Sequence, residues 1–149
     1  MKRSYSLCLA AFLLLLNLQL QAQTNIPALI TSDQTWDISG SPYRLTQNAY
    51  IDTGVTVRVM PGVRITSIKW NIRLLIDGNF EAVGTKDSII EFDTMQIAYS
   101  KKSLDYNPTT NAGAHLKYCS FSNADVGKRT VEASGTDILI ENCTFYNNY

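Results

Sequence analysis

Apolar and polar residues alternate along most of the chain after residue 23. Residues 55–59 read Val-Thr-Val-Arg-Val, residues 90–92 read Ile-Glu-Phe, and residues 138–141 read Ile-Leu-Ile-Glu. A period of two places apolar side chains on one face of an extended segment, whereas a helix needs apolar residues three and four positions apart. The abundant Thr, Ile, Val, Tyr and Phe fit a pleated surface. The pattern therefore predicts short β-strands and no amphipathic helix.

Glycine marks the ends of several of these segments. Pro61-Gly62, Asp77-Gly78 and Val83-Gly84 separate apolar runs that are only a few residues long. The chain must turn sharply between such runs, and glycine adopts positive φ there without a steric penalty. We therefore expect corners at these three pairs. No GxGxxG or P-loop pattern accompanies them, so they do not indicate phosphate binding.

The C-terminal part of the chain contains an internal repeat. Residues 118–123 (Tyr-Cys-Ser-Phe-Ser-Asn) resemble residues 142–147 (Asn-Cys-Thr-Phe-Tyr-Asn) at an offset of 24. Two residues interrupt the alternation in each copy, and asparagine suits such a bend because it tolerates the left-handed conformation. The same apolar phase continues upstream through Ala114 and Leu116 and, a further 24 residues back, through Ile90, Phe92, Met95 and Ile97.

A repeat of this length, made of very short strands, favours one coil of a β-solenoid. A propeller blade needs about 40 or more residues, and the pattern lacks the consensus of a leucine-rich repeat. The alternative is an ordinary β-sandwich in which the similarity arose by chance. We predict an all-β fold, a right-handed parallel β-helix, because a single coil cannot bury its own apolar face and stacking solves that problem.

Stacked coils bring equivalent side chains about 4.8 Å apart, so that like residues form ladders. The offset of 24 predicts three inward ladders, which are Met95, Cys119 and Cys143; Ile97, Phe121 and Phe145; and Phe92, Leu116 and Ile140.

The expected solenoid occupies the chain after residue 22. We expect an N-terminal cap region over residues 23–50 and coils over residues 51–149, about five in all at this period. No capping segment follows the last strand, and an uncovered final coil exposes an unpaired edge. The sequence therefore leads us to expect the N-terminal portion of a longer solenoid whose C-terminal cap is missing.

Residues 1–22 have the order of features found in a secretory signal peptide. Lys2 and Arg3 form a positive n-region, residues 7–16 form an apolar core, and Ala22 supplies a small residue for cleavage. The apolar run is shorter than the 18 to 20 residues, roughly, that a membrane span requires. We predict cleavage after Ala22 and a location outside the cytoplasm, either secreted or at the cell surface.

Charge argues against several partners. The whole chain has 13 basic and 13 acidic residues, and loss of Lys2 and Arg3 leaves a net charge of −2. A mature chain of this charge does not attract nucleic acid or an anionic membrane. No later stretch is long and apolar enough to predict a transmembrane segment.

The sequence contains no recognisable catalytic, cofactor or metal motif. We expect Cys119 and Cys143, the only cysteines after residue 22, to be buried thiols. A disulfide remains the alternative in an oxidising compartment, although parallel Cβ vectors would strain it. Two cysteines without further ligands do not make a zinc site. His115, the sole histidine, should point outward from its strand, with no catalytic partner placed beside it.

Two segments interrupt the repeat and are expected to be exposed loops. Residues 99–112 include Tyr106 and Asn107, and residues 123–130 include Lys128 and Arg129. Because the register is kept around both, we expect them to bulge from the same side of consecutive coils. These four side chains are the candidate surface contacts, and solvated loops without a ligand are the alternative.

Several segments together resemble a known family. Residues 140–148 (Ile-Glu-Asn-Cys-Thr-Phe-Tyr-Asn-Asn) resemble a coil of right-handed parallel β-helix proteins with the pectin-lyase-like fold. The order of residues 61–63 (Pro-Gly-Val), 78–85 (Gly-Asn-Phe-Glu-Ala-Val-Gly-Thr) and 89–92 (Ile-Ile-Glu-Phe) is similar to the entry region of secreted bacterial members, especially those of Bacteroidetes. The resemblance implies the fold and export. It does not fix an activity, because the fold hosts lyases, hydrolases, adhesins and spacers.

These observations predict an exported or cell-surface β-helix scaffold that is non-catalytic in this segment. Its expected role is adhesion or contact with extracellular glycans or cell-surface components. The alternative is the N-terminal part of a polysaccharide lyase or glycoside hydrolase whose active site lies beyond residue 149, and a purely structural spacer is a third reading.

Overall fold

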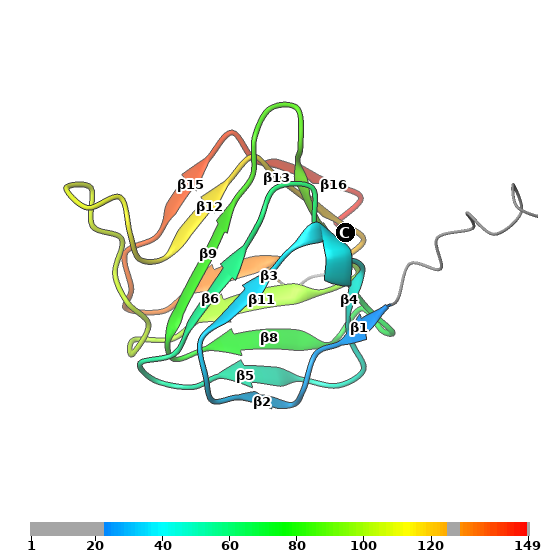
Figure 1. Cartoon of the computed structure of the whole chain (residues 1–149), viewed down its shortest axis with the longest axis horizontal. Helices are drawn as coiled ribbons and strands as arrows, with labels where there is room; N and C mark the ends of the chain where they lie inside the picture. Colours follow the sequence, from blue (N-terminus) through cyan, green and yellow to red (C-terminus); the bar gives the residue numbers. More distant parts are fainter. Residues whose placement is uncertain (1–22, 125–128, 149) are drawn as a thin grey trace, which may run out of the picture.

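The computed structural model describes residues 23–124 and 129–148, and the predicted signal peptide lies outside them (Figure 1). The strands form three sheets, here called A, B and C. Sheet A contains β1 (Thr24–Asn25), β4 (Tyr43–Leu45), β7 (Arg64–Ser67), β10 (Ile90–Asp93), β13 (Cys119–Ser122) and β16 (Thr144–Tyr146). Sheet B contains β2 (Leu29–Ile30), β5 (Ala49–Ile51), β8 (Arg73–Ile76), β11 (Gln96–Tyr99) and β14 (Val131–Ala133). Sheet C contains β3 (Gln34–Trp36), β6 (Thr56–Val59), β9 (Asn79–Val83), β12 (His115–Lys117) and β15 (Leu139–Glu141).

The chain visits the three sheets in the order A, B, C and then begins the next coil. Every pairing between these strands is parallel, and the stack contains about five coils. The prediction of an all-β parallel solenoid is therefore confirmed. Residues 23–50, which we expected to form a cap, already contain β1 to β4 and the start of β5, and these strands pair in register with later ones. A single 3₁₀ turn, η1 (Ile38–Gly40), is the only helix among the described residues, which thus hold no helix able to cross a membrane.

The C-terminal step of all three predicted ladders follows the predicted register. Phe121 pairs with Phe145 and Leu116 pairs with Ile140, as the offset of 24 requires. Cys119 and Cys143 directly precede the paired Ser120 and Thr144 and follow the same register.

The third member of each predicted ladder is wrong. Cys119 pairs with Ile90 instead of Met95, and Phe121 pairs with Phe92 instead of Ile97. Leu116 pairs with Ala82 instead of Phe92, while Ile97 lies in sheet B between Leu74 and Val131. The cause is the long connection over residues 100–114, because it lengthens the coil between β10 and β13 beyond 24 residues.

Left-handed residues at two different corners explain the false alignment. Tyr118 and Asn142 have φ of 48° and 53° and join sheet C to sheet A. Thr94 has φ of 62° but joins sheet A to sheet B, as Asn123 begins to do in the next coil with φ of 56°. Both corners therefore place one left-handed residue between two alternating strands, and they produce the same pattern of apolar and polar positions.

Glycine serves two different purposes at the predicted corners. Gly62 has a φ of +81°, as expected. Gly78 does not have positive φ, and its lack of a side chain matters for a different reason. A Cβ atom at Gly78 would overlap the carbonyl oxygens of Asp52 and Val55, so only glycine lets the two coils approach.

The core is a column of inward-facing side chains enclosed by the three sheets. The rings of Phe92, Phe121 and Phe145 stack with centroids 4.8 Å apart at both steps. Their interplanar angles are 6° and 10°, so each ring covers the face of the next. Phe80 packs edge-on against Phe92 and against Trp36, which extends the aromatic column toward the first coil.

The aromatic column yields a stability prediction. Phe121 is fully buried, whereas Phe145 is 48% exposed. Phe121→Ala should lower the free energy of unfolding by about 3–5 kcal/mol through lost burial and a residual cavity. Phe145→Ala serves as the matched control and should cost less than half as much, because its ring loses less buried area. Urea denaturation of both variants measures this difference, and equal costs would contradict the stacked core.

Candidate functional site

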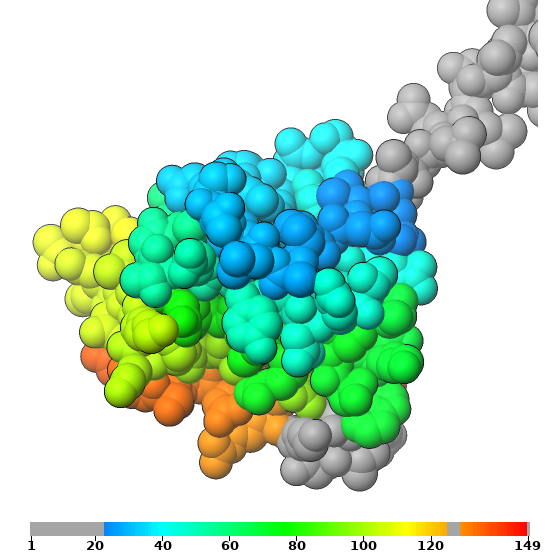
Figure 2. Space-filling model, turned by 90° about the horizontal axis from the view of Figure 1, so that it is seen from below, coloured from blue at the N-terminus to red at the C-terminus, as the bar shows by residue number. Residues whose placement is uncertain are grey.

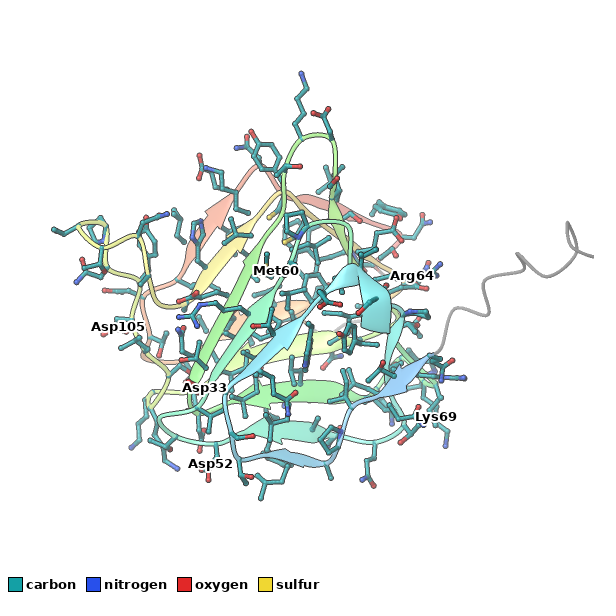
Figure 3. The ribbon with its side chains drawn as sticks, in the orientation of Figure 1. Asp33, Asp52, Met60, Arg64, Lys69 and Asp105 are labelled. Carbon is teal, nitrogen blue, oxygen red and sulfur yellow. The ribbon has the colours of Figure 1, made fainter. Side chains whose placement is uncertain are left out.

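The long connection between β11 and β12 forms a surface hollow of about 510 Å³. This loop hollow is lined by residues of the segment 104–112, and it contains both Tyr106 and Asn107 from the predicted contacts. The loop projects from the body of the solenoid (Figures 1 and 2), and Asp105 at its base lies across the molecule from Arg64 of sheet A (Figure 3).

The polar groups of these two side chains already hold the loop in shape. The Asn107 Oδ1 atom accepts hydrogen bonds from the backbone N–H groups of Thr109 (2.9 Å) and Thr110 (3.3 Å). The Tyr106 hydroxyl donates to Asn111 Oδ1 at 2.9 Å. The loop hollow therefore offers a ligand fewer free polar groups than its sequence implied.

The two predicted loops interrupt the coil at different corners, which corrects the expectation that they share one side. Residues 100–114 connect sheet B to sheet C, whereas residues 123–130 connect sheet A to sheet B. Arg129 lies against Glu132 of sheet B, whereas Tyr106 packs against His115 of sheet C, and Lys128 lies outside the described residues. The expectation failed because the repeat revealed two strands per coil and the solenoid has three.

The outer face of sheet B carries a second hollow, of about 270 Å³. We call it the sheet B groove, and it is lined by Tyr50, Arg73, Leu75, Ile76, Asp77, Ala98, Tyr99, Ser100, Glu132 and Ser134. The register places Tyr50, Leu75, Ala98 and Glu132 in one outward ladder across four coils. In Figure 2 the surface colours follow this sheet from the blue of β2 through green to the orange of β14.

Charged side chains border the groove at both ends of its strands. Arg73 Nη2 lies 2.7 Å from Glu132 Oε2, and Arg129 Nη1 lies 3.6 Å from Glu132 Oε1. The Arg73 Nε atom and the Gln96 Nε2 atom are buried without a hydrogen-bond partner among the described residues. Buried donors without partners are uncommon in folded proteins, so Arg73 Nε marks the groove as a place where a ligand or water would complete the bonding. Gln96 pairs with Arg73 in register but does not line the groove.

Asp77 is held at the opposite end of the groove. Lys102 Nζ donates to Asp77 Oδ2 at 2.8 Å, and the Ser100 hydroxyl donates to Oδ1 at 2.7 Å. The hydrogen bonds from Lys102 and Ser100 lower the pKa of Asp77 below its ordinary value. This carboxylate therefore stays ionised at neutral pH and acts as a hydrogen-bond acceptor.

Sequence reasoning missed the groove because its residues are far apart in the chain. Tyr50, Leu75 and Glu132 are separated by offsets that share no single period. An alternating strand pattern shows that each points outward, but the register of sheet B is needed to align them. The exposed aromatic Tyr50 was the one local signal that the sequence contained.

Cys119 and Cys143 are free thiols. Cys119 is buried and Cys143 is partly exposed. A hydrogen bond with Cys143, together with burial, raises the pKa of Cys119. The Cys119 thiol therefore stays protonated and packs as part of the core.

His115 differs from its expected environment. It lies on the outer face of sheet C, as the strand alternation requires, yet only 2% of its surface is exposed. The loop over residues 104–113 folds back across it, and the Tyr106 ring meets its imidazole edge-on at 5.2 Å. A cover of this kind cannot be deduced from the alternation of the strand that carries His115.

In comparisons with known proteins, no family model, no curated protein and no solved structure matches this chain. The residues that the structure describes contain no group of three His, Cys, Asp or Glu side chains that could hold a metal ion. The parallel solenoid is therefore established by the architecture alone, and the family resemblance remains a prediction.

The groove electrostatics yield a second prediction. Lys102→Met should raise the pKa of Asp77 toward its ordinary value of 3.8, because the largest cause of its lowering is removed. Lys101→Met is the matched control, since it removes a neighbouring lysine that does not contact Asp77. NMR titration of the Asp77 carboxyl carbon measures the shift. An unchanged Asp77 titration in the Lys102 variant would contradict the ion pair.

Proposed function

We propose that this chain is an exported β-solenoid scaffold that contacts extracellular glycans through the sheet B groove, without catalysis in this segment. The single observation that carries the proposal is the part of the outward ladder that runs from Tyr50 to Glu132. It combines an exposed aromatic ring, an apolar floor and fixed polar groups on rigid strands.

The chemistry of this arrangement suits a sugar ring. A pyranose presents C–H groups on its faces and hydroxyl groups around its rim. The Tyr50 ring, 48% exposed, offers an amphipathic surface for such a face, while Leu75 and Ala98 continue the apolar floor. The guanidinium of Arg73 donates hydrogen bonds, and the carboxylates of Glu132 and Asp77 accept them from hydroxyl groups.

The same groups support binding better than bond cleavage. A glycosidase needs a carboxylic acid that is protonated when it meets the leaving group, which requires a raised pKa. The Asp77 carboxyl has a lowered pKa because Lys102 and Ser100 donate hydrogen bonds to it. Asp77 is therefore suited to holding a hydroxyl group and poorly suited to donating a proton.

Glycan contact is tested by removing the exposed ring. Tyr50→Ala should weaken binding to a polysaccharide about tenfold, which corresponds to about 1.4 kcal/mol. Trp70→Ala is the matched control, because Trp70 is 53% exposed and lines neither hollow. Affinity electrophoresis with pectin and with a neutral glucan measures both variants.

Two outcomes would count against the proposal. If the wild-type chain is not retarded by any polysaccharide, or if both variants weaken binding equally, the groove is not the contact surface. The appearance of unsaturated sugar ends during the incubation would favour a lyase over a scaffold.

Export is tested separately through the N-terminus. The charged n-region, the apolar core over residues 7–16 and Ala22 support cleavage by signal peptidase. Expression of the full chain in a bacterial host should yield a product outside the cytoplasm that begins at Gln23. N-terminal sequencing of that product checks the cleavage site. A chain that stays in the cytoplasm with Lys2 and Arg3 intact would contradict export.

A further inference from the structure

The segment over residues 104–113, here called the strap, covers the only histidine of the chain. His115 lies in β12 and pairs in register with Glu81 of the preceding coil and Leu139 of the following one. The Tyr106 ring closes the outer side at 5.2 Å. The His115 Nε2 atom is buried and has no hydrogen-bond partner among the described residues. The strap therefore encloses an imidazole that is bound by packing and not by polar contacts.

The strap is attached to the solenoid by a small number of hydrogen bonds. The Tyr106 N–H donates to the Asp137 carbonyl oxygen, and the Asp137 N–H donates to Asp105 Oδ1, each at 2.9 Å. The Gly113 N–H donates to Glu81 Oε1 at 3.2 Å. At the start of the strap, the Leu104 N–H donates to the Gly78 carbonyl oxygen at 3.1 Å, and the Leu104 carbonyl oxygen accepts from the Ala114 N–H at 3.0 Å. None of these bonds belongs to the strand pairing, so the strap can open without disturbing the three sheets.

The charged groups around His115 already have partners. Glu81 Oε2 lies 3.0 Å from Arg58 Nε, and Glu81 Oε1 also accepts from Asn79 Nδ2 at 2.7 Å. Glu141 Oε2 lies 2.8 Å from Lys117 Nζ. An imidazolium formed at this position would meet the Lys117 ammonium and two carboxylates that are already engaged. A buried cation without its own partner is costly, so the closed strap disfavours the charged form.

We propose that the strap and His115 form an acid-sensitive latch, in which proton uptake by His115 releases the strap from sheet C. At neutral pH the imidazole is uncharged and the strap packs over it. In acid the imidazole gains a proton, and the strap opens so that water can solvate the cation. The latch is independent of glycan contact, since it concerns the outer face of sheet C and not the sheet B groove.

The sign of the pH dependence follows from the burial of the imidazole. Burial, reinforced by the charge of Lys117, lowers the pKa of His115 below its ordinary value of 6.5. The opened strap restores a solvated imidazole with a pKa near 6.5. The open form therefore binds more protons, and closure loses free energy as the pH falls below 6.5 toward the lowered value. Between the two pKa values, each pH unit changes the opening equilibrium by up to tenfold.

The experiment uses the single histidine as its own probe. NMR of the purified chain follows the His115 Cε1–H resonance, and amide exchange follows the protection factors of Tyr106 and Gly113, whose N–H groups bond the strap to Asp137 and Glu81, between pH 7.5 and pH 5. We expect a His115 midpoint below 6.5. Protection of these two amides should fall by up to tenfold per pH unit below 6.5. The amide of Tyr50, which donates to the Ala28 carbonyl oxygen in sheet B, is the internal control and should keep its protection.

A variant separates the latch from general acid effects. His115→Phe keeps a ring under Tyr106 but cannot gain a proton, so its strap amides should stay protected at pH 5. Equal loss of protection in His115→Phe and the wild type would overturn the proposal, as would a wild-type midpoint at or above 6.5. If His115→Phe does not fold, His115→Gln replaces it under the same criteria, and the wild-type midpoint decides independently.

Discussion

The structure depends on one constraint, which is that no single coil can bury its own apolar side chains. Each coil here contributes only a few inward residues per strand, and their partners come from the coils above and below. The stacked rings of Phe92, Phe121 and Phe145 show the result, because each ring covers the face of the next at 4.8 Å. Parallel pairing follows from this, since the chain must return to the same sheet in the same direction to place like residues in register.

The same constraint decided what the sequence could predict. A period of two identified the strands, and the repeat of residues 118–123 at 142–147 identified the solenoid, because both features are set by inward residues that must match their neighbours. The offset of 24 did not predict the pairing of the preceding coil, where β13 pairs with β10. A left-handed residue at Thr94 mimics those at Tyr118 and Asn142, although it turns the chain at a different corner. Local pattern alone does not distinguish two corners that use the same backbone conformation.

The candidate site was harder to predict for a related physical reason. Outward residues need not match their neighbours in order to fold, so they leave no repeat in the sequence. Tyr50, Arg73 and Glu132 meet only because the register of sheet B aligns β5, β8 and β14. The loop residues Tyr106 and Asn107 were found because aromatic and amide side chains in a long insertion are conspicuous. Their use in holding the loop in shape was visible only in the structure.

Insertions in a solenoid are tolerated where they leave the inward register unchanged, and the segment over residues 100–114 shows how such an insertion gains a role. The Ser103 hydroxyl donates to the Ile76 carbonyl oxygen at 2.6 Å, and the Leu104 N–H donates to the Gly78 carbonyl oxygen at 3.1 Å, which fixes its first residues to the preceding coil. On one side of this anchor, Ser100 and Lys102 hold Asp77 at the rim of the sheet B groove. On the other side, the strap closes over His115 on sheet C. This one connection thus borders the outer faces of both sheet B and sheet C. The hydrogen bonds that Ser103 and Leu104 make to the preceding coil join neutral groups, so they do not depend on the charge of His115. A proton gained at His115 therefore opens the strap while leaving the sheet B groove in place.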